Sequence, residues 1–526
     1  MSTEIAKEAI KKDFFFGTGP ATYGYVFSQY KPESFNQYML WNLRFYQVKG
    51  IAFESLPTIG AVGIITLALV ILSFIGVVAY NLSRDKERNK IYSLGLAIAS
   101  LIFIIDLMMV RVDGGILILG IMACALTLVA VFIESETERK FLCLSLKASP
   151  KYALTLAFIF MVVSSGVAFL FVYLGKLFVA DVYAGSALRQ TAVSEEGSLA
   201  SLGRAIQLYG KEGRYFSRIG QEYMFLANQE ALKPDTERDV NKITNYLNLS
   251  IAASTTAKNL LPTDVFVVEN LAQIYENSVL YVAGSVALAE ENYKAAQALE
   301  PGNPLYNIKL GQLKLAYLGT KKEEAEKKQL VEETKNLFQK AVDLKNNYDI
   351  GWYNLFLAQE GLGNLDDAIN SIVNAVKLKN GDVNYLFNLA RVLQSRGKDQ
   401  DNNDAEIIYK EIVKMDDKQI NVHFNLGTLY EKMKRKDDAI AAYQKVLSLI
   451  PNDDQNKTVR DQLNKVISNV KAGIPNTPEN IGITQPEPQP KAPENVTPES
   501  VPPVPGNLNP EPAPTPTPAP APNPVE

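Results

Sequence analysis

Histidine and cysteine are almost absent from this chain of 526 residues, which contains one histidine and two cysteines. Two cysteines cannot form a disulfide framework or a four-cysteine zinc site. The single histidine, His423, also excludes a metal centre built on several histidines. The sequence therefore predicts no bound metal ion.

An excess of positive charge is also lacking. The chain has 53 lysine and arginine residues and 57 acidic residues, for a net charge of −4, and no segment is strongly basic. Because nucleic-acid binding depends on positive charge that neutralises phosphates, this composition excludes a nucleic-acid partner. The mean hydropathy of −0.03 is that of a soluble protein, but it averages over very different segments.

Four apolar runs dominate the first third of the chain. They are residues 56–80, 91–110, 114–133 and 152–175. Each has at least the roughly 20 residues that a helix needs to cross a hydrocarbon core about 30 Å thick. Because backbone polar groups must be paired within lipid, we predict four transmembrane helices.

The loops between these runs predict their orientation. Residues 81–90 and 135–151 each contain four lysine or arginine residues, whereas the turn between the second and third runs contains only Arg111. The positive-inside rule places the first two loops in the cytoplasm. Both ends of this multi-pass protein of the bacterial cell membrane are then extracytoplasmic.

Residues 1–55 are expected outside the cell, although no apolar signal precedes them. We therefore expect the chain to be the C-terminal part of a longer multi-spanning protein, and insertion of the first helix as a reverse anchor is the alternative. Twelve aromatic residues lie within residues 14–46, together with Gly17, Gly19 and Gly24. An amphipathic segment at the membrane interface explains this composition, and a ligand-binding role is the alternative.

Two stretches, FFFGTGPATYGYVF from residue 14 and FESLPTIGAVG from residue 53, resemble the O-antigen ligase/polymerase family of bacterial membrane glycosyltransferases. The resemblance covers roughly residues 5–80. The matching positions are Gly17, Gly19, Tyr23, Asn42, Arg44, Gly60 and Gly63.

The resemblance implies part of a lipid-carrier-dependent glycosyltransferase, with an undecaprenyl-diphosphate-linked glycan as its partner and without a cofactor. It points to Arg44 as the residue that binds the diphosphate, because a guanidinium can pair with phosphate oxygens through two hydrogen bonds. An interfacial arginine is the alternative. The family's loop histidine has no counterpart in residues 1–185, so we assign no catalytic residue and expect this chain alone to be inactive.

Helical periodicity and higher charge replace the apolar runs after residue 185. The run HFNLGTLYEKMKRKDDAIAAYQKVLSLIP, residues 423–451, fits the tetratricopeptide (TPR) pattern of two antiparallel helices. Small Gly427 and Ala439 let the helices approach, and His423 takes a packing position. The same pattern recurs upstream. We call the first large-residue position of each repeat its anchor; His423 is the anchor of the last repeat, and the earlier anchors are Phe216, Val268, Asn307, Trp352 and Leu386. Where the interval between two anchors is longer, we predict longer helices or loops.

Such a solenoid has a concave groove lined by the first helix of each repeat. The mixed charge and regularly spaced aromatic residues of this groove suit a protein or peptide ligand, and solvated helix faces are the alternative. By register, the residues predicted to line it are Tyr353, Asn384, Phe387, Arg391, Gln394, Asn421, Phe424, Thr428, Glu431 and Lys432.

The last 52 residues contain 18 of the 27 prolines. Their apolar side chains are too few for a core, so we predict a disordered tail that favours the polyproline II conformation. A spacer or tether is its predicted role, and a ligand for a proline-binding domain is the alternative.

These patterns predict an all-α chain with an outer segment over residues 1–55, a four-helix transmembrane region over 56–180, a TPR α-solenoid over 186–474 and a proline-rich tail over 475–526. The predicted function is that of the C-terminal half of an O-antigen ligase or polymerase. Its extracytoplasmic TPR domain would bind a protein or the glycan acceptor in cell-envelope assembly. A membrane-anchored TPR scaffold without catalytic activity is the alternative.

Overall fold

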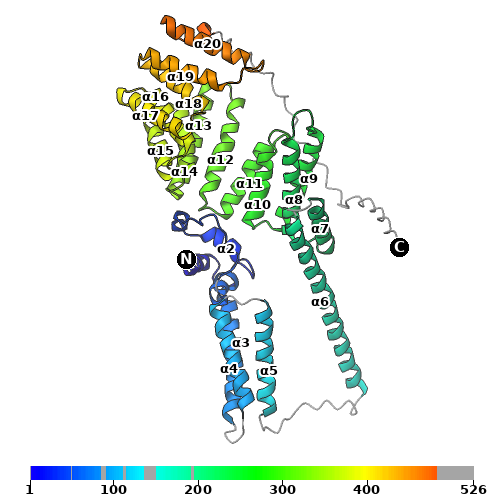
Figure 1. Cartoon of the computed structure of the whole chain (residues 1–526). Coiled ribbons are helices and arrows are strands. Elements are labelled where there is room, and N and C mark those ends of the chain that lie inside the picture. Colours follow the sequence, from blue (N-terminus) through cyan, green and yellow to red (C-terminus); the bar gives the residue numbers. More distant parts are fainter. Residues whose placement is uncertain are drawn as a thin grey trace, which may run out of the picture. The chain divides into compact units, whose positions relative to one another are not determined.

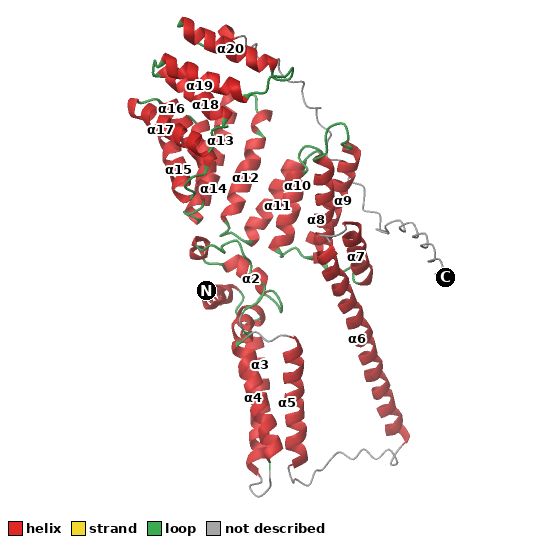
Figure 2. Cartoon of the chain, viewed as in Figure 1, coloured by secondary structure: helices red, strands yellow, loops and turns green. Residues whose placement is uncertain are grey.

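The computed structural model describes residues 2–48, 50–84, 90–110, 114–134, 150–190 and 195–481. Every regular element in these ranges is a helix, which confirms the predicted all-α fold (Figure 2). The described residues fall into two compact units. The first holds the residues up to Pro32 and those from Leu43 to Pro301, and the second holds Glu33–Asn42 and the residues from Gly302 onward. The proline-rich tail from residue 482 and most of the two basic loops lie outside the described residues.

Four helices of the first unit form where the sequence has its apolar runs. They are α3 (Ile51–Arg84), α4 (Ile91–Met109), α5 (Gly114–Glu134) and α6 (Pro150–Gln190) (Figure 1). Three of them, α3, α4 and α6, are long and apolar enough to cross a membrane, whereas α5 contributes a shorter apolar stretch, Gly115–Val131. Most of their large apolar side chains are exposed, so these helices present surfaces suited to lipid.

Small and hydroxyl-bearing residues join α4 to α5. The hydroxyl groups of Ser100 and Thr127 share a hydrogen bond of 2.8 Å, and both side chains are fully buried. Gly120 on α5 leaves room for the ring of Phe103, because a Cβ atom at Gly120 would lie 2.0 Å from that ring. Close approach at small residues and hydrogen bonds between helices are typical of helix packing in lipid.

Helix α6 continues well beyond its apolar part. Its 41 residues give a length of about 60 Å, twice the thickness of a hydrocarbon core. Near its C-terminal end, Ala180 is fully buried together with Ala205 of α7 (Glu195–Leu208). Asp181 accepts a hydrogen bond from the Tyr215 hydroxyl of α8 (Gly213–Ala231). The predicted boundary at residues 180–186 therefore lies inside one continuous helix.

The rest of the first unit consists of short N-terminal helices and helical pairs. α8 packs on α9 (Val240–Leu260), and α10 (Val265–Asn277) packs on α11 (Ser285–Leu299). Asp239 and Asp264 begin α9 and α10 by accepting hydrogen bonds from backbone N–H groups of the first turn. The N-terminal helices are α1 (Ser2–Lys12) and α2 (Tyr23–Tyr30).

The second unit is a stack of helical pairs followed by α20 and the short α21 (Figure 1). Its helices are η1 (Glu33–Gln37), α12 (Pro304–Ala316), η2 (Leu318–Thr320), α13 (Glu324–Leu344), α14 (Asp349–Gly361), α15 (Leu365–Leu378), α16 (Val383–Arg396), α17 (Asp399–Met415), α18 (Ile420–Lys432), α19 (Lys436–Leu449), α20 (Lys457–Ala472) and α21 (Pro478–Ile481). One apolar core runs from α14 through α20.

Small residues set the spacing inside these pairs. A Cβ atom at Gly427 of α18 would lie 2.5 Å from the Tyr443 ring of α19. One at Gly311 of α12 would lie 2.3 Å from the Phe338 ring of α13. His423 is buried, and its Nε2 atom lies 2.9 Å from the Asp417 carbonyl oxygen. The predicted packing roles of Gly427 and His423 are therefore confirmed.

Residues 33–42 belong to the second unit although they precede the apolar helices in the sequence. Asn36 Nδ2 donates to the Gly302 carbonyl at 2.7 Å, and Lys345 Nζ donates to the Asn36 carbonyl at 2.5 Å. The Trp41 ring packs on Tyr348, with ring centres 5.5 Å apart, and lies 5.4 Å from Lys345 Nζ. Burial lowers the pKa of Lys345 and raises the pKa of Tyr348 to about 12. Part of the aromatic N-terminal segment is thus a component of the repeat stack.

Candidate functional site

The first helices of three successive repeats, α14, α16 and α18, carry a row of aromatic side chains. Tyr353, Phe387 and Phe424 each follow the anchor residue of their repeat by one position. Phe424 is 41% exposed, and the other two are half-buried. Phe387 and Phe424 pack on tyrosines of the second helices, with ring centres 6.1 Å apart for Phe387 and Tyr409 and 5.6 Å apart for Phe424 and Tyr443. The Tyr353 ring packs on Tyr385 of α16, with ring centres 5.2 Å apart. Packing therefore fixes the row while part of its surface stays open.

Polar side chains beside this aromatic row are paired with one another. The Arg391 guanidinium donates two hydrogen bonds of 2.7 Å to the Glu360 carboxylate, one to each oxygen. Gln394 Nε2 donates to Thr428 Oγ1 at 2.8 Å, and Lys432 Nζ donates to the Gln394 carbonyl at 2.6 Å. These bonds link each repeat to the next.

Two buried tyrosines and one asparagine complete the pairing. The Tyr409 hydroxyl donates to Gln394 Oε1 at 3.1 Å, and the Tyr443 hydroxyl donates to Glu431 Oε1. Burial raises the pKa of both tyrosines above its ordinary value, so the hydroxyls remain donors. Asn476, which follows α20, donates to both Glu431 oxygens at 3.0 and 3.2 Å. The charged side chains Glu360, Arg391, Glu431 and Lys432 therefore all have hydrogen-bond partners within the chain.

All ten residues predicted to line the groove lie on α14, α16 and α18. Asn384 and Asn421, in the first turns of α16 and α18, are exposed, and their binding role stays a prediction. Sequence reasoning missed three residues of α14 that occupy equivalent positions. These residues are Ile350, Leu357 and Glu360. They lie at the same distances along the chain from Trp352 as Asn384, Arg391 and Gln394, respectively, lie from Leu386.

An asparagine also recurs two positions after each anchor, at Asn354, Asn388 and Asn425. Each Nδ2 atom donates to the carbonyl oxygen four residues earlier at 2.8 Å. Asn354 and Asn388 are nearly buried, whereas Asn425 is half-buried. A carboxamide can both donate and accept, as a peptide backbone requires. The repeated aromatic–asparagine pair in the sequence would have identified this row.

Arg44, the predicted diphosphate ligand, contacts two carboxylates in the first unit. Its Nε and Nη2 atoms donate to Glu300 Oε2 at 2.9 and 2.7 Å, and Nη2 donates to Glu269 Oε2 at 2.5 Å. Lys31 Nζ donates to Glu300 Oε1 at 2.9 Å, and the side chains of Lys31 and Glu300 are each 1% exposed. Arg44 thus compensates buried acids, and its role toward a diphosphate stays a prediction.

The two stretches that carry the family resemblance lie against each other in the first unit. Helix α3 is interrupted at Gly60, whose φ of 62° and ψ of −170° are not helical. The N–H groups of Ala61 and Val62, which this break leaves without helical partners, donate to the carbonyl oxygens of Phe14 and Phe15 at 2.9 and 3.1 Å. In return, Gly19 N–H donates to the Thr58 carbonyl at 2.8 Å.

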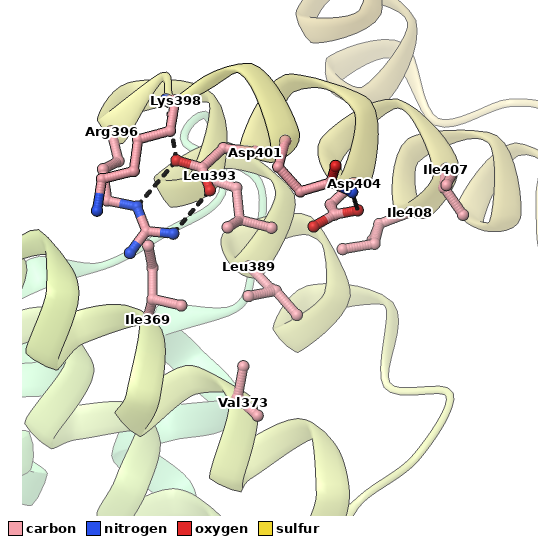
Figure 3. A pocket seen from close by; sticks show the side chains of 11 residues that line it. Ile369, Val373, Leu389, Leu393, Arg396, Lys398, Asp401, Asp404, Ile407 and Ile408 are labelled. Atoms are coloured by element: carbon pink, nitrogen blue, oxygen red, sulfur yellow. Dashed lines mark hydrogen bonds and ion pairs between the residues drawn. The ribbon is translucent and has the colours of Figure 1, made fainter.

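A separate cavity of about 650 Å³ lies among α15, α16 and α17 (Figure 3). Leu389 and Leu393 of α16 line it, and at its rim Arg396 bonds to Asp401 at 2.7 and 2.9 Å. The cavity shares no residue with the ten predicted groove residues. No cluster of three or more histidine, cysteine or acidic residues that could hold a metal ion occurs in the described part of the chain.

Comparison with known proteins gives one family match. The model of the TPR domain of cytochrome c-type biogenesis protein H matches residues 341–457. No curated protein matches the chain.

Solved structures that match this chain are distant in sequence. The C-terminal part of a TPR repeat-containing protein from Cytophaga hutchinsonii is 15% identical, with 52% of this chain and 96% of that chain covered and a TM-score of 0.39. A tetratricopeptide repeat protein from Parabacteroides merdae is 14% identical, with 55% of this chain and 99% of that chain covered and a TM-score of 0.36. YrrB, described as a TPR protein with an unusual peptide-binding site, is 18% identical, with 38% of this chain and 94% of that chain covered and a TM-score of 0.32. With the family match and the stacked helical pairs, the chain contains a TPR repeat domain, a kind of domain that binds proteins or peptides.

Proposed function

We propose that the TPR domain binds an extended segment of a protein along the groove of α14, α16 and α18. The aromatic row of Tyr353, Phe387 and Phe424 carries this proposal. Aromatic side chains that are rigid and partly exposed supply much of the binding energy at protein interfaces. The paired Arg391 and Glu360 leave little uncompensated charge, so the proposed ligand is held mainly by apolar contacts and backbone hydrogen bonds.

An array of random 12-residue peptides, probed with the full chain in detergent, tests this proposal. We expect peptides that bind the unaltered chain to bind the Phe387→Ala/Phe424→Ala variant at least about tenfold more weakly, because each truncation removes a ring from the groove. Met415→Ala, at an exposed position at the end of α17, is the matched control and should bind as the unaltered chain does. Equal binding by all three chains would remove the groove as the binding site.

We also propose that α3 to α6 anchor the chain in a bacterial membrane, with the TPR domain on the outer side. The apolar surfaces of these helices and the basic residues of the connecting loops support this arrangement. An enzyme reporter that is active only outside the cytoplasm, fused after residue 481, should be active in cells. The same reporter fused within residues 135–149 should be inactive. The reverse pattern would overturn the proposed orientation.

A second candidate function is glycan transfer by the membrane part, as in O-antigen ligases and polymerases. The contact between residues 14–19 and the break in α3 supports it, because the two stretches that resemble the family lie together. Glycan transfer and thermal stability should be measured together for Arg44→Gln in membranes that hold the complete protein. Loss of transfer with an unchanged melting temperature supports a site role for Arg44. Unchanged transfer excludes that role.

A further inference from the structure

We propose that the chain's own proline-rich segment, residues 512–525, occupies the aromatic groove of the TPR domain. This inference rests on the proposed peptide-binding function of that groove and names its ligand. The segment reads PAPTPTPAPAPNPV, with proline at every second position from 512 to 524. Charge, shape and reach each favour this segment.

Charge complementarity is the first argument. Glu360 and Arg391 neutralise each other, Glu431 is held by Asn476 and Tyr443, and Lys432 donates to a backbone carbonyl. A charged peptide would therefore lose hydration in this groove and meet charged groups that already hydrogen-bond to partners within the chain. Residues 512–525 contain no charged side chain, and the nearest acids, Glu511 and Glu526, flank the segment.

Shape is the second argument. Alternating proline favours polyproline II, which exposes its backbone carbonyls and presents proline rings on its faces. Grooves lined by aromatic residues bind such segments because the ligand is already extended and loses little conformational entropy. Tyr353, Phe387 and Phe424 provide one ring per repeat, and Asn425 at the end of the row provides a half-buried carboxamide.

Reach is the third argument. The described chain leads to this segment from beside the groove, because Asn476 bonds to Glu431 of α18. Thirty residues, 482–511, separate Ile481 from the segment. At about 3.1 Å per residue they extend up to about 90 Å, whereas α14 and α18 are only roughly 20 Å apart at normal helix spacing. A connection of this length gives an effective concentration on the order of 1 mM.

A labelled synthetic peptide of residues 508–526 tests the proposal. Its binding should be measured by fluorescence anisotropy to the full chain and to a chain that ends at residue 481. We expect the shortened chain to bind at least about tenfold more tightly, because the full chain's own segment competes for the groove. Replacing the seven prolines of residues 512–524 in the peptide by alanine should weaken binding by about tenfold or more. Neither the alanine peptide nor the shortened chain alters the sequence of the repeats, so a change in binding cannot come from misfolded repeats.

The same peptide then tests the position of the site. Phe387→Ala/Phe424→Ala in the shortened chain should abolish binding, and Met415→Ala should not. Equal affinity of full and shortened chains, or equal affinity of the alanine peptide, would overturn the proposal. If the peptide fails to bind while array peptides still bind through Phe387 and Phe424, only the identity of the ligand is wrong. If array peptides also fail, the proposed groove function is wrong as well.

Discussion

Gly17 and Gly60 contact each other through their backbones, although 42 residues separate them in the chain. A Cβ atom at Gly60 would lie 2.6 Å from the Gly17 nitrogen, and one at Gly17 would lie 2.8 Å from the Gly60 nitrogen. Both residues have positive φ angles, of 64° and 62°. The break in α3 and the turn after Phe16 therefore depend on each other, because neither backbone can accept a side chain there.

Gly60→Ala should destabilise the N-terminal part of the chain by on the order of 3 kcal/mol. The cost combines a backbone conformation that is almost confined to glycine with an overlap against the Gly17 backbone. The melting temperature of the detergent-purified chain measures it. Gly76→Ala is the matched control in the same helix, because no atom lies within 4 Å of its added methyl group. Equal melting temperatures for the two variants would show that the Gly17–Gly60 contact is not formed.

Arg44→Ala should lower the free energy of unfolding by about 3 kcal/mol. The substitution leaves the fully buried Glu300 with Lys31 alone and removes the bond to Glu269. Thermal unfolding followed by circular dichroism measures the effect. Lys11→Ala, which removes an exposed pair with Glu8, should change stability by less than about 0.5 kcal/mol. An Arg44→Ala effect as small as this control would contradict a structural role for Arg44.

Sequence periodicity was sufficient for the parts of the fold in which neighbouring residues decide the structure. Runs of apolar residues predicted where α3 to α6 lie, and the TPR anchors predicted the pairs around Trp352, Leu386 and His423. The long interval between Asn307 and Trp352 is explained by the 21 residues of α13 and the short helix η2. The predicted groove residues come from register alone, because helical repeats place equal offsets on equal faces, and their binding role stays a prediction.

Contacts between distant segments could not be predicted in this way. Nothing in the local pattern around Arg44 or Lys31 indicates Glu300, which lies more than 250 residues away. Residues 33–42 are held in the repeat stack by the bond between Asn36 and Lys345, which are also more than 300 residues apart in the sequence. The continuity of α6 through residues 180–186 could not be predicted for another reason. A helix suited to lipid can continue into a packed domain when no proline interrupts it, as α6 does.

Gly427→Ala should destabilise the last repeat by about 1–3 kcal/mol. The added methyl group would overlap the Tyr443 ring, which cannot move freely because its hydroxyl bonds to Glu431. Gly361→Ala provides a control at the end of α14, where the nearest atom, on Val331, would lie 3.7 Å from the methyl group. That control should be neutral or stabilising by up to about 1 kcal/mol. Melting temperatures that fall equally would contradict the tight packing of α18 on α19.

Asp401 should make the stability of the repeat domain depend on acid pH. The bonds from Arg396 hold the pKa of this nearly buried carboxyl below its usual value of 3.8, against the opposing effect of burial. The unfolded chain therefore takes up the proton first as pH falls, and the stabilising contribution is complete above about pH 4 and lost progressively below it.

The comparison of the unaltered chain with Asp401→Asn measures this contribution. At pH 7 we expect the variant to be less stable by about 2 kcal/mol, because Arg396 and the backbone N–H of Lys398 lose a charged acceptor. Between pH 4 and pH 2 the difference in melting temperature should shrink, since only the unaltered chain loses a charge at this position. Asp437→Asn, at an exposed position in the first turn of α19, should differ little from the unaltered chain. A difference for Asp401→Asn that stays constant down to pH 2 would show that the Arg396 pair does not stabilise the fold.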